Sequence, residues 1–231
     1  MTGNYVIRNI NRADRKVISG LEAAGVATVH EAYGRRGLLD SAIRPIQEGM
    51  SVAGSAVTVL CPPGDNMMLH AAVEVVQPGD LLVVTTTSPS TDGMFGDLLA
   101  TSLIKRGAVG LVIEAGVRDT AELRTMGFPV WSRAIHAQGT VKATPGSVNV
   151  PVVCAGMTIE PGDVVVADDD GVVVVSRSNA SEALAAANAR IEKEEVARRR
   201  LEAGELGLDF YGLRDQLEVL GVRWVESQDD L

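Results

Sequence analysis

The sequence is poor in residue types that several common functions need. Trp, Tyr and Phe make up only 3% of its 231 residues, and its formal net charge is −9 at pH 7. A chain with this charge repels a phosphate backbone, and it has no basic run interleaved with aromatic side chains on which bases could stack. We therefore expect no direct binding of nucleic acid.

Cysteine is also scarce, and long apolar runs are absent. Cys61 and Cys154 lie in apolar, strand-like surroundings without CxxC spacing, which predicts buried free thiols rather than a zinc site or a disulfide framework. No apolar run reaches the roughly 18 residues of a membrane span, and residues 1–14 lack the basic and then apolar order of a signal peptide. The expectation is a cytoplasmic protein that does not enter a membrane.

Several catalytic motifs are missing as well. The sequence contains no GxGxxG, GxxxxGK[ST] or GxSxG, which argues against dinucleotide, methyl-donor, P-loop and hydrolase chemistry. His30, His70 and His136 are dispersed without a second histidine at i+4, so a histidine metal site is not expected. Of the four lysines, only Lys142 in "GTVKAT" has the apolar surroundings that a Schiff-base lysine needs.

What the sequence does contain is enough apolar residues, 46%, for one large core. Helical spacing over residues 13–37, broken at Gly25, predicts two short N-terminal helices. The middle of the chain is rich in β-branched residues, and helices are expected there only at about 65–76 and 97–106. The expected strands are 51–61, 80–87, 108–116, 128–133, 139–144 and 148–156.

The C-terminal third begins with a predicted hairpin and continues as a helix. In "ADDDG" (167–171), the Asp-Gly pair between two valine runs is typical of a tight turn, and the later ligands of a calcium-binding EF-hand loop are missing. A helix is predicted over 179–203, with Arg198-Arg199-Arg200 on a solvated, salt-bridged face, and then a short helix and a last strand. We expect one α/β domain over residues 1–178 and a helical arm over 179–231 that packs on a neighbouring subunit of a homo-oligomer.

Three charged residues in the middle of the chain are predicted to converge. A helix over Asp97–Arg106 would be about 15 Å long, and only "GAV" connects it to the strand over Gly110–Gly116. The strand must therefore run back antiparallel to the helix. This places Asp97 at the same end of the unit as Arg118 and Asp119.

Such a cluster suits the binding of an anion and a metal ion. The N–H groups of Leu98, Leu99 and Ala100 would be free at the first helical turn and would suit a carboxylate. Arg118 could grip the same anion, while Asp119 could hold a hard divalent cation that a 2-oxo acid chelates.

A simpler interpretation stays open at this point. Asp97 would then be only a helix N-cap, and Arg118-Asp119 only a surface ion pair. Gly96 favours the functional interpretation, because a residue without Cβ lets a ligand approach the backbone closely.

The residues also carry a family resemblance. Asp97, twenty residues and then Arg118-Asp119 match the Asp-x20-Arg-Asp signature of the superfamily that contains the ribonuclease E activity regulator-like proteins and the class II pyruvate aldolases. With "GFPVWSR", "GTVKATPGSVNVPVVCAG" and "PGDVVVADDDGVVVV", the chain resembles the 4-hydroxy-4-methyl-2-oxoglutarate/4-carboxy-4-hydroxy-2-oxoadipate aldolases over nearly its whole length. The likeness includes the C-terminal "GELGLDFYGLRDQLEVLGVRWV", which the shorter regulator-like proteins generally lack.

The resemblance implies a β/β/α swivelling-type fold, trimers paired into hexamers and a role in the catabolism of aromatic rings, including protocatechuate. The implied reaction is a Mg²⁺- or Mn²⁺-dependent retro-aldol cleavage that releases pyruvate together with oxaloacetate or a second pyruvate, with oxaloacetate decarboxylation as a side activity. Alternatives are a non-catalytic regulator that binds ribonuclease E, or an enzyme that acts primarily as an oxaloacetate decarboxylase.

The resemblance also implies roles for single residues. Asp119 would bind the metal, Arg118 the pyruvyl unit and its enolate, and Asp97 a metal-bound water. The backbone of Gly96, Leu98, Leu99 and Ala100 would receive the substrate carboxylate. An acid from the neighbouring subunit would be Glu194, with Glu195 as the competing choice.

Overall fold

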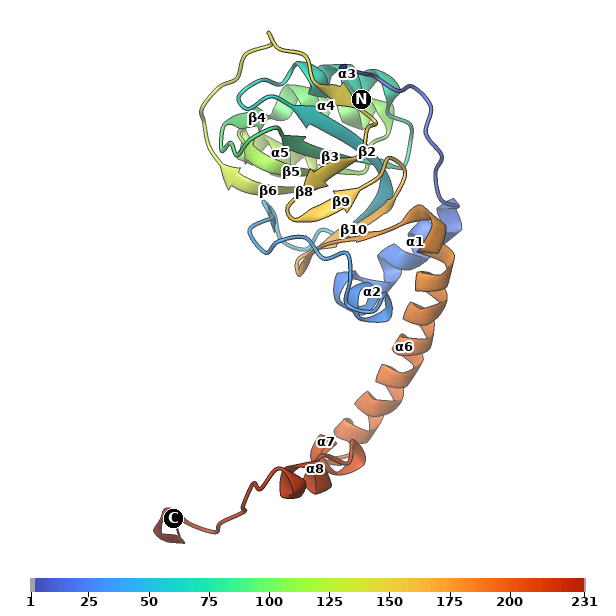
Figure 1. The fold of residues 1–231 in the computed structure, drawn as a ribbon, viewed down its shortest axis with the longest axis vertical. Helices are drawn as coiled ribbons and strands as arrows, with labels where there is room; N and C mark the ends of the chain where they lie inside the picture. The colour runs from blue at the N-terminus through green and yellow to red at the C-terminus, as the bar shows by residue number, and fades with distance from the viewer. Residues whose placement is uncertain (1–2, 231) are drawn as a thin grey trace. The chain divides into compact units, whose positions relative to one another are not determined.

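The computed structural model describes residues 3–230, drawn as a ribbon in Figure 1. These residues fall into two compact units, divided between Asn188 and Ala189. No helix in this described part of the chain is both long enough and apolar enough to cross a membrane.

The first unit is built around a large mixed β-sheet. Its strands are β1 (Arg44–Pro45), β2 (Val52–Cys61), β3 (Asp80–Thr86), β4 (Gly93–Phe95), β5 (Gly110–Val117), β6 (Val130–Ile135), β7 (Ser147–Val148), β10 (Val164–Asp168) and β11 (Gly171–Val175). In the described residues this sheet has nine strands: seven follow one another in the order β1-β6-β5-β3-β2-β10-β11, while β4 pairs with β5 and β7 pairs with β2. The central strands β6, β5, β3 and β2 run parallel, and β10 pairs antiparallel with both β2 and β11.

Helices and a small hairpin cover the two faces of this sheet. The helices are α1 (Arg15–Ala24), α2 (Val26–Ala32), α3 (Met67–Val75), α4 (Asp97–Arg106) and α5 (Thr120–Met126), and the hairpin consists of β8 (Val152–Cys154) and β9 (Met157–Ile159). Figure 1 shows α3, α4 and α5 on one face and β8-β9 on the other, and each face has its own buried apolar cluster. Strands covered on both faces read as continuous apolar runs, as the valines of β10 and β11 do. The mixed α/β fold predicted from the sequence is confirmed.

The helix expected over Asp97–Arg106 has these bounds in the structure. It follows Gly96, which is extended, and it stops at Gly107, whose φ of 82° lies in the left-handed region that favours glycine. Leu99 and Leu103 are buried against the sheet, which fixes the rotation of the helix. Its first turn therefore lies beside the C-terminal end of β5.

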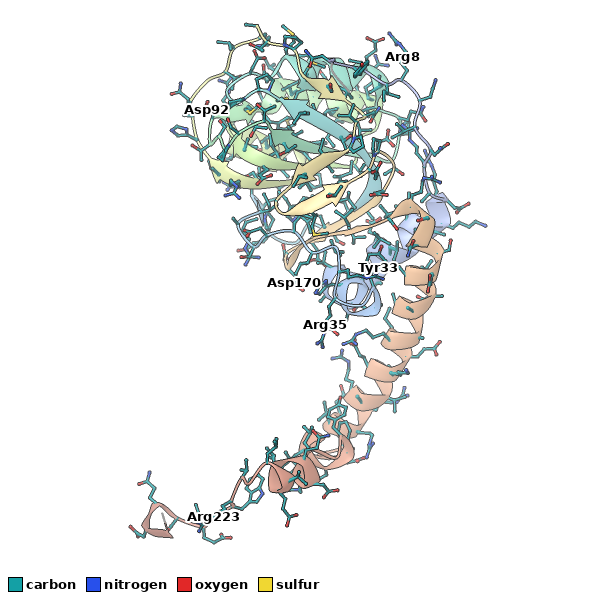
Figure 2. The ribbon with its side chains drawn as sticks, in the orientation of Figure 1. Arg8, Tyr33, Arg35, Asp92, Asp170 and Arg223 are labelled. Atoms are coloured by element: carbon teal, nitrogen blue, oxygen red, sulfur yellow. The ribbon has the colours of Figure 1, made fainter. Side chains whose placement is uncertain are left out.

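The acidic "ADDDG" segment forms the predicted hairpin between β10 and β11. Asp168 pairs with Gly171 across the strands, and Asp170 lies at the tip (Figure 2). The Asp168 carboxylate accepts hydrogen bonds from the N–H groups of Asp170, at 2.9 Å, and of Val26 at the start of α2, at 2.8 Å. In this turn the positive φ belongs to Gly171, at 142°. Asp168 thus caps the helix α2, whose N-cap residue, Gly25, has no side chain to do so.

Four local expectations were wrong. The single strand expected over 148–156 is divided between β7, which pairs with β2, and β8, which pairs with β9 in a separate sheet. Residues 139–144 do not form a strand, and only Val141 makes an isolated bridge, to Asp65. The nearby N–H groups of Ala143 and Thr144 are taken by the carboxylate of Asp65, so they are not available to a neighbouring strand. The last strand expected after the short C-terminal helix does not form either, since residues 221–225 contain no strand.

The fourth error is a missed helix, α5, which follows Asp119 directly and buries Leu123. The sequence "TAELRTM" is too short for its helical period to stand out, and its burial against the sheet supplies the stability that local propensity does not.

The second unit is helical. α6 (Ala180–Glu202) begins in the first unit, where Ala180, Ala183 and Ala187 are buried, and it ends before Gly204, with α7 (Gly207–Phe210) and α8 (Leu213–Val219) after it. No side chain among residues 189–229 is buried, and Val219 and Leu220 are 87% and 77% exposed.

The arginine run in α6 has the predicted ion pairs. Arg198 and Arg199 lie 3.9 and 3.5 Å from Glu195, and Arg200 lies 2.6 Å from Glu205. These are exposed pairs on one helix or its end, each of which contributes little to stability. They confirm the salt-bridged, solvated face predicted for the basic run.

Candidate active site

A cavity of about 80 Å³ lies where the C-terminal ends of β4 and β5 meet the N-terminus of α4. Ligand sites in open α/β sheets commonly lie beyond the carboxyl ends of the strands. In Figure 2 the label of Asp92 marks this end of the unit, because Asp92 immediately precedes β4. The cavity is lined by Asn66, His70, Gly93, Met94, Phe95, Gly96, Asp97, Leu98, Leu99, Arg118, Asp119 and Lys142.

The three charged residues predicted to converge do lie together. The backbone N–H of Asp97 approaches Oδ2 of Asp119 at 3.4 Å, and Nε of Arg118 lies 3.4 Å from the same oxygen. The N–H of Arg118 also donates to the carbonyl of Phe95 at 2.9 Å, which ties the end of β5 to the end of β4. The antiparallel geometry of α4 and β5 thus produces the cluster, as the sequence predicted.

Asp119 has an unusual backbone for a residue other than glycine. Its φ of 55° and ψ of 40° lie in the left-handed region, and it precedes α5 without capping that helix through its side chain. Such strained conformations are frequent at functional sites, where the surrounding structure holds them. The side chain is 33% exposed and faces the cavity rather than its own helix.

The interpretation of Asp97 as a simple N-cap does not hold, because the N-cap of α4 is Gly96 and Asp97 is the first helical residue. The ion pair between Arg118 and Asp119 does exist. It lies in the wall of a cavity rather than on an open surface, and the Arg118 side chain remains 45% exposed. An incoming anion can therefore still reach the guanidinium.

The first turn of α4 offers fewer free N–H groups than the sequence suggested. The N–H of Ala100 donates to the carbonyl of Gly96 at 3.1 Å, so the expectation that it is free for a carboxylate was wrong. The N–H groups of Leu98 and Leu99 have no carbonyl four residues earlier within the helix. These two remain suited to an anion at the positive end of the helix dipole.

The surroundings of Asp119 fit a hard divalent cation with few protein ligands. Among residues 3–230, no group of three or more His, Cys, Asp or Glu side chains is placed to hold a metal ion. Magnesium commonly binds through one or two carboxylates and completes its shell with water and substrate oxygens, whereas structural zinc needs four protein ligands. Gly96 leaves the space for this, because a Cβ there would lie 2.1 Å from Oδ2 of Asp119.

Three polar side chains that the sequence did not connect with the site also line the cavity: Asn66, His70 and Lys142. Lys142 stood out in the sequence only as a candidate for imine chemistry, yet its side chain is exposed, so it lacks the desolvation which that chemistry needs. Burial and the charge of Lys142 lower the pKa of His70. No local signal could have found these residues, because they come from α3 and from an irregular loop.

The predicted acids of the C-terminal helix lie in the second unit. Glu194 is paired with Arg190 at 2.8 Å, and Glu195 with Arg198 and Arg199. Their contribution to a neighbouring subunit stays a prediction.

Comparison with known proteins identifies the family. Residues 26–174 match the RraA-like family model, described as Aldolase/RraA, and the chain belongs to this family. A protein of Halalkalibacterium halodurans with the provisional name 4-hydroxy-4-methyl-2-oxoglutarate aldolase is 30% identical over 75% of this chain and 82% of its own length. A Burkholderia multivorans protein with the same provisional name is 35% identical over 64% of this chain and 89% of its own length.

A solved structure shows the same fold. Streptomyces coelicolor RraAS2, described as an unusual member of the RNase ES inhibitor RraA protein family, superposes with a TM-score of 0.73 at 33% identity, covering 82% of this chain and 100% of that one. The RraA-like fold predicted from the resemblance is confirmed.

Proposed function

We propose that this protein is a divalent-metal-dependent aldolase that cleaves 4-carboxy-4-hydroxy-2-oxoadipate and 4-hydroxy-4-methyl-2-oxoglutarate to release pyruvate. The observation that carries the proposal is the convergence of Arg118, Asp119 and the first turn of α4 on one cavity. The provisional aldolase names of the two relatives support the same reaction.

The residues suit the binding of a 2-oxo acid. The guanidinium of Arg118 donates to the carboxylate and to the developing negative charge on the keto oxygen. The N–H groups of Leu98 and Leu99 receive the carboxylate at the helix N-terminus. Both interactions hold the pyruvyl end of the substrate at the first turn of α4.

The bond changes of the reaction define what the site must do. The substrate alcohol loses its proton, the C3–C4 bond breaks, and the electron pair passes to the enolate oxygen of the pyruvyl fragment. Protonation of the enolate carbon then gives pyruvate. A water held by Asp97 is the group that takes the alcohol proton in this scheme.

A divalent cation, Mg²⁺ or Mn²⁺, would be held by Asp119 with Asp97 beside it, and it would supply Lewis-acid stabilisation of the enolate. Loss of carbon dioxide from oxaloacetate leads to the same enolate, so oxaloacetate decarboxylation belongs to the proposal as a side activity.

The C-terminal unit fits an oligomer in which it packs on a neighbouring copy. Val219 and Leu220 are almost fully exposed in the chain, and single domains seldom leave such a group of apolar side chains in water. We propose a trimer or hexamer in which Glu194, or Glu195 in its place, reaches the neighbouring cavity.

The direct test is pyruvate release from 4-carboxy-4-hydroxy-2-oxoadipate, measured before and after exhaustive chelation and after Mg²⁺ or Mn²⁺ is restored. Asp119→Ala should lose both activity and metal dependence, whereas Arg118→Ala should mainly impair pyruvyl binding and enolate stabilisation. Wild-type rates in both variants, or turnover that survives chelation, would refute the proposal.

Two alternatives give different results in the same experiments. A regulator that binds ribonuclease E without catalysis shows tight nuclease binding and no lyase turnover, which the RraAS2 neighbour makes worth measuring. An enzyme that is primarily an oxaloacetate decarboxylase has the larger kcat/KM for oxaloacetate than for the aldol substrates.

A further inference from the structure

The wall of the candidate cavity that carries Lys142 is held in place by one buried carboxylate. Asp65 is 2% exposed and lies just before α3. Its Oδ2 accepts hydrogen bonds from the N–H groups of Ala143, at 2.8 Å, and Thr144, at 2.6 Å, and its Oδ1 accepts one from Met67 at 2.9 Å. A buried carboxylate with three N–H donors is a strong tether for an otherwise irregular loop.

The backbone completes this tether on the other side of Lys142. The N–H of Val141 donates to the carbonyl of Gly64 at 2.9 Å, and the N–H of Asn66 donates to the carbonyl of Val141 at 3.1 Å. Both chain neighbours of Lys142 are therefore fixed to residues 64–66. The backbone of Lys142 has little freedom, although its segment belongs to no regular strand.

The same short segment is also bonded to a second segment that lines the cavity. The side-chain amide of Asn66 donates to the carbonyl of Met94, at 3.0 Å, two residues before Gly96. A carbonyl only accepts hydrogen bonds, so the NH₂ group of Asn66 must face Met94. Residues 65 and 66 thus join two of the chain segments that line the cavity.

Lys142 itself is available to a ligand. Among residues 3–230, no carboxylate lies within ion-pair distance of its ammonium group. Burial alone would raise the pKa of Asp65, but the three N–H donors and the charge of Lys142 outweigh it and lower that pKa. The Asp65 carboxylate therefore stays charged at neutral pH, and the tether persists under assay conditions.

We propose that Asp65 is a positioning residue of the candidate site, which acts by holding the ammonium group of Lys142 where a bound 2-oxo acid needs a second cation besides Arg118. The inference rests on the proposed function, since it takes the ligand to be an organic anion. Asp65 touches no substrate in this scheme. Its whole effect on binding passes through the loop that it holds.

A double-mutant cycle tests this dependence. Asp65→Asn keeps the shape of the side chain but removes the charge and replaces one acceptor oxygen by an NH₂ group, so the side chain can no longer accept from all three N–H donors. Lys142→Met keeps the apolar length and removes the ammonium. Each single variant should raise KM for the aldol substrate about tenfold, as expected from the loss of one charge-assisted interaction, with a smaller change in kcat.

The KM of the double variant should not exceed that of Lys142→Met alone, because without the ammonium group Asp65 has nothing left to position.

A matched control is Asp163→Asn. Asp163 is also buried, and its carboxylate accepts N–H bonds from Glu160 at 3.0 Å and from Arg177 at 2.9 Å, but neither it nor those partners line the cavity. Its KM should equal that of the wild type.

Pyruvate binding, titrated calorimetrically with each variant, provides a readout that does not need turnover. Non-additive losses in KM or in pyruvate affinity support the inference, even if the preferred leaving group differs from the one proposed. Additive losses, or a KM effect of Asp65→Asn that persists in the Lys142→Met background, overturn it while leaving the aldolase proposal intact. A wild-type protein that neither cleaves the aldol substrate nor binds pyruvate overturns both.

Discussion

The closeness of Gly96 to Asp119 leads to a sharp prediction for Gly96→Ala. The backbone of Gly96 is extended, with φ of −157° and ψ of −167°, so alanine adopts it without strain. The added Cβ would lie 2.1 Å from Oδ2 and 3.1 Å from Cγ of Asp119. To restore an ordinary contact at about 3.4 Å, the carboxylate must retreat by about 1.3 Å.

This displacement should affect function far more than stability. A misplacement of about 1 Å at a catalytic group can lower the rate about 100-fold, so kcat/KM should fall by roughly that factor and metal affinity with it. The Asp119 side chain is 33% exposed and can move towards solvent. The free energy of unfolding should therefore change by no more than about 1 kcal/mol, since alanine also restricts the unfolded chain.

The measurements are steady-state pyruvate release, titration of Mn²⁺ and urea denaturation of the same preparation. Gly139→Ala is the matched control, because its Cβ would meet Nη1 of Arg118 at 3.4 Å, an ordinary contact. This variant should keep activity within about threefold of the wild type, which corresponds to a change of less than about 0.7 kcal/mol in the activation free energy. If Gly96→Ala retains near-wild-type activity and metal affinity, the assignment of Asp119 as the metal-binding group is wrong.

Three further predictions concern stability and reactivity. Asp168→Ala removes the acceptor for the N–H of Val26 at the start of α2. The free energy of unfolding, measured by urea denaturation, should fall by about 1–2 kcal/mol. An unchanged denaturation midpoint would show that the cap is not needed. Burial raises the pKa of the Cys61 thiol to about 12, so the native protein should not react with a thiol reagent at pH 8, and labelling should appear only on unfolding. Burial and a nearby lysine lower the pKa of His70, so its protonation is less favourable in the folded state than in the unfolded one. The free energy of unfolding should therefore fall as the pH drops through about 6.5, the pKa of the unfolded chain. The variant His70→Gln should abolish that part of the pH dependence.

The core of the site was predictable because its geometry is set by short-range features. Gly96 and Gly107 bound the helix α4, a three-residue connection forces the chain back, and β5 ends at Val117. From these features alone Asp97 must approach Arg118 and Asp119. The catalytic roles of these residues stay predictions, which the variants described above test.

The rest of the site was not predictable in the same way. The expected strand at 139–144 looks like a β-strand by composition, but the carboxylate of Asp65, more than seventy residues earlier, takes the N–H groups that a strand would use. Whether the N–H of Ala100 is free depends on where the helical hydrogen bonds begin. It donates to the carbonyl of Gly96 and is therefore not available to a ligand. Both errors come from hydrogen bonds whose partners the local sequence does not specify.

The sequence by itself determined the α/β class and the meeting of Asp97 with Arg118 and Asp119, because apolar periodicity, glycine positions and connection length act over a few residues. It indicated the family through its resemblance to the Asp-x20-Arg-Asp signature. Only the tertiary structure decided that Asp119 takes a left-handed backbone before α5, that Gly96 leaves room for its carboxylate, and that Lys142 joins the cavity. These features depend on contacts between segments far apart in the chain. Their energies arise when the sheet, α3 and the 139–144 loop pack together, and no single segment contains them.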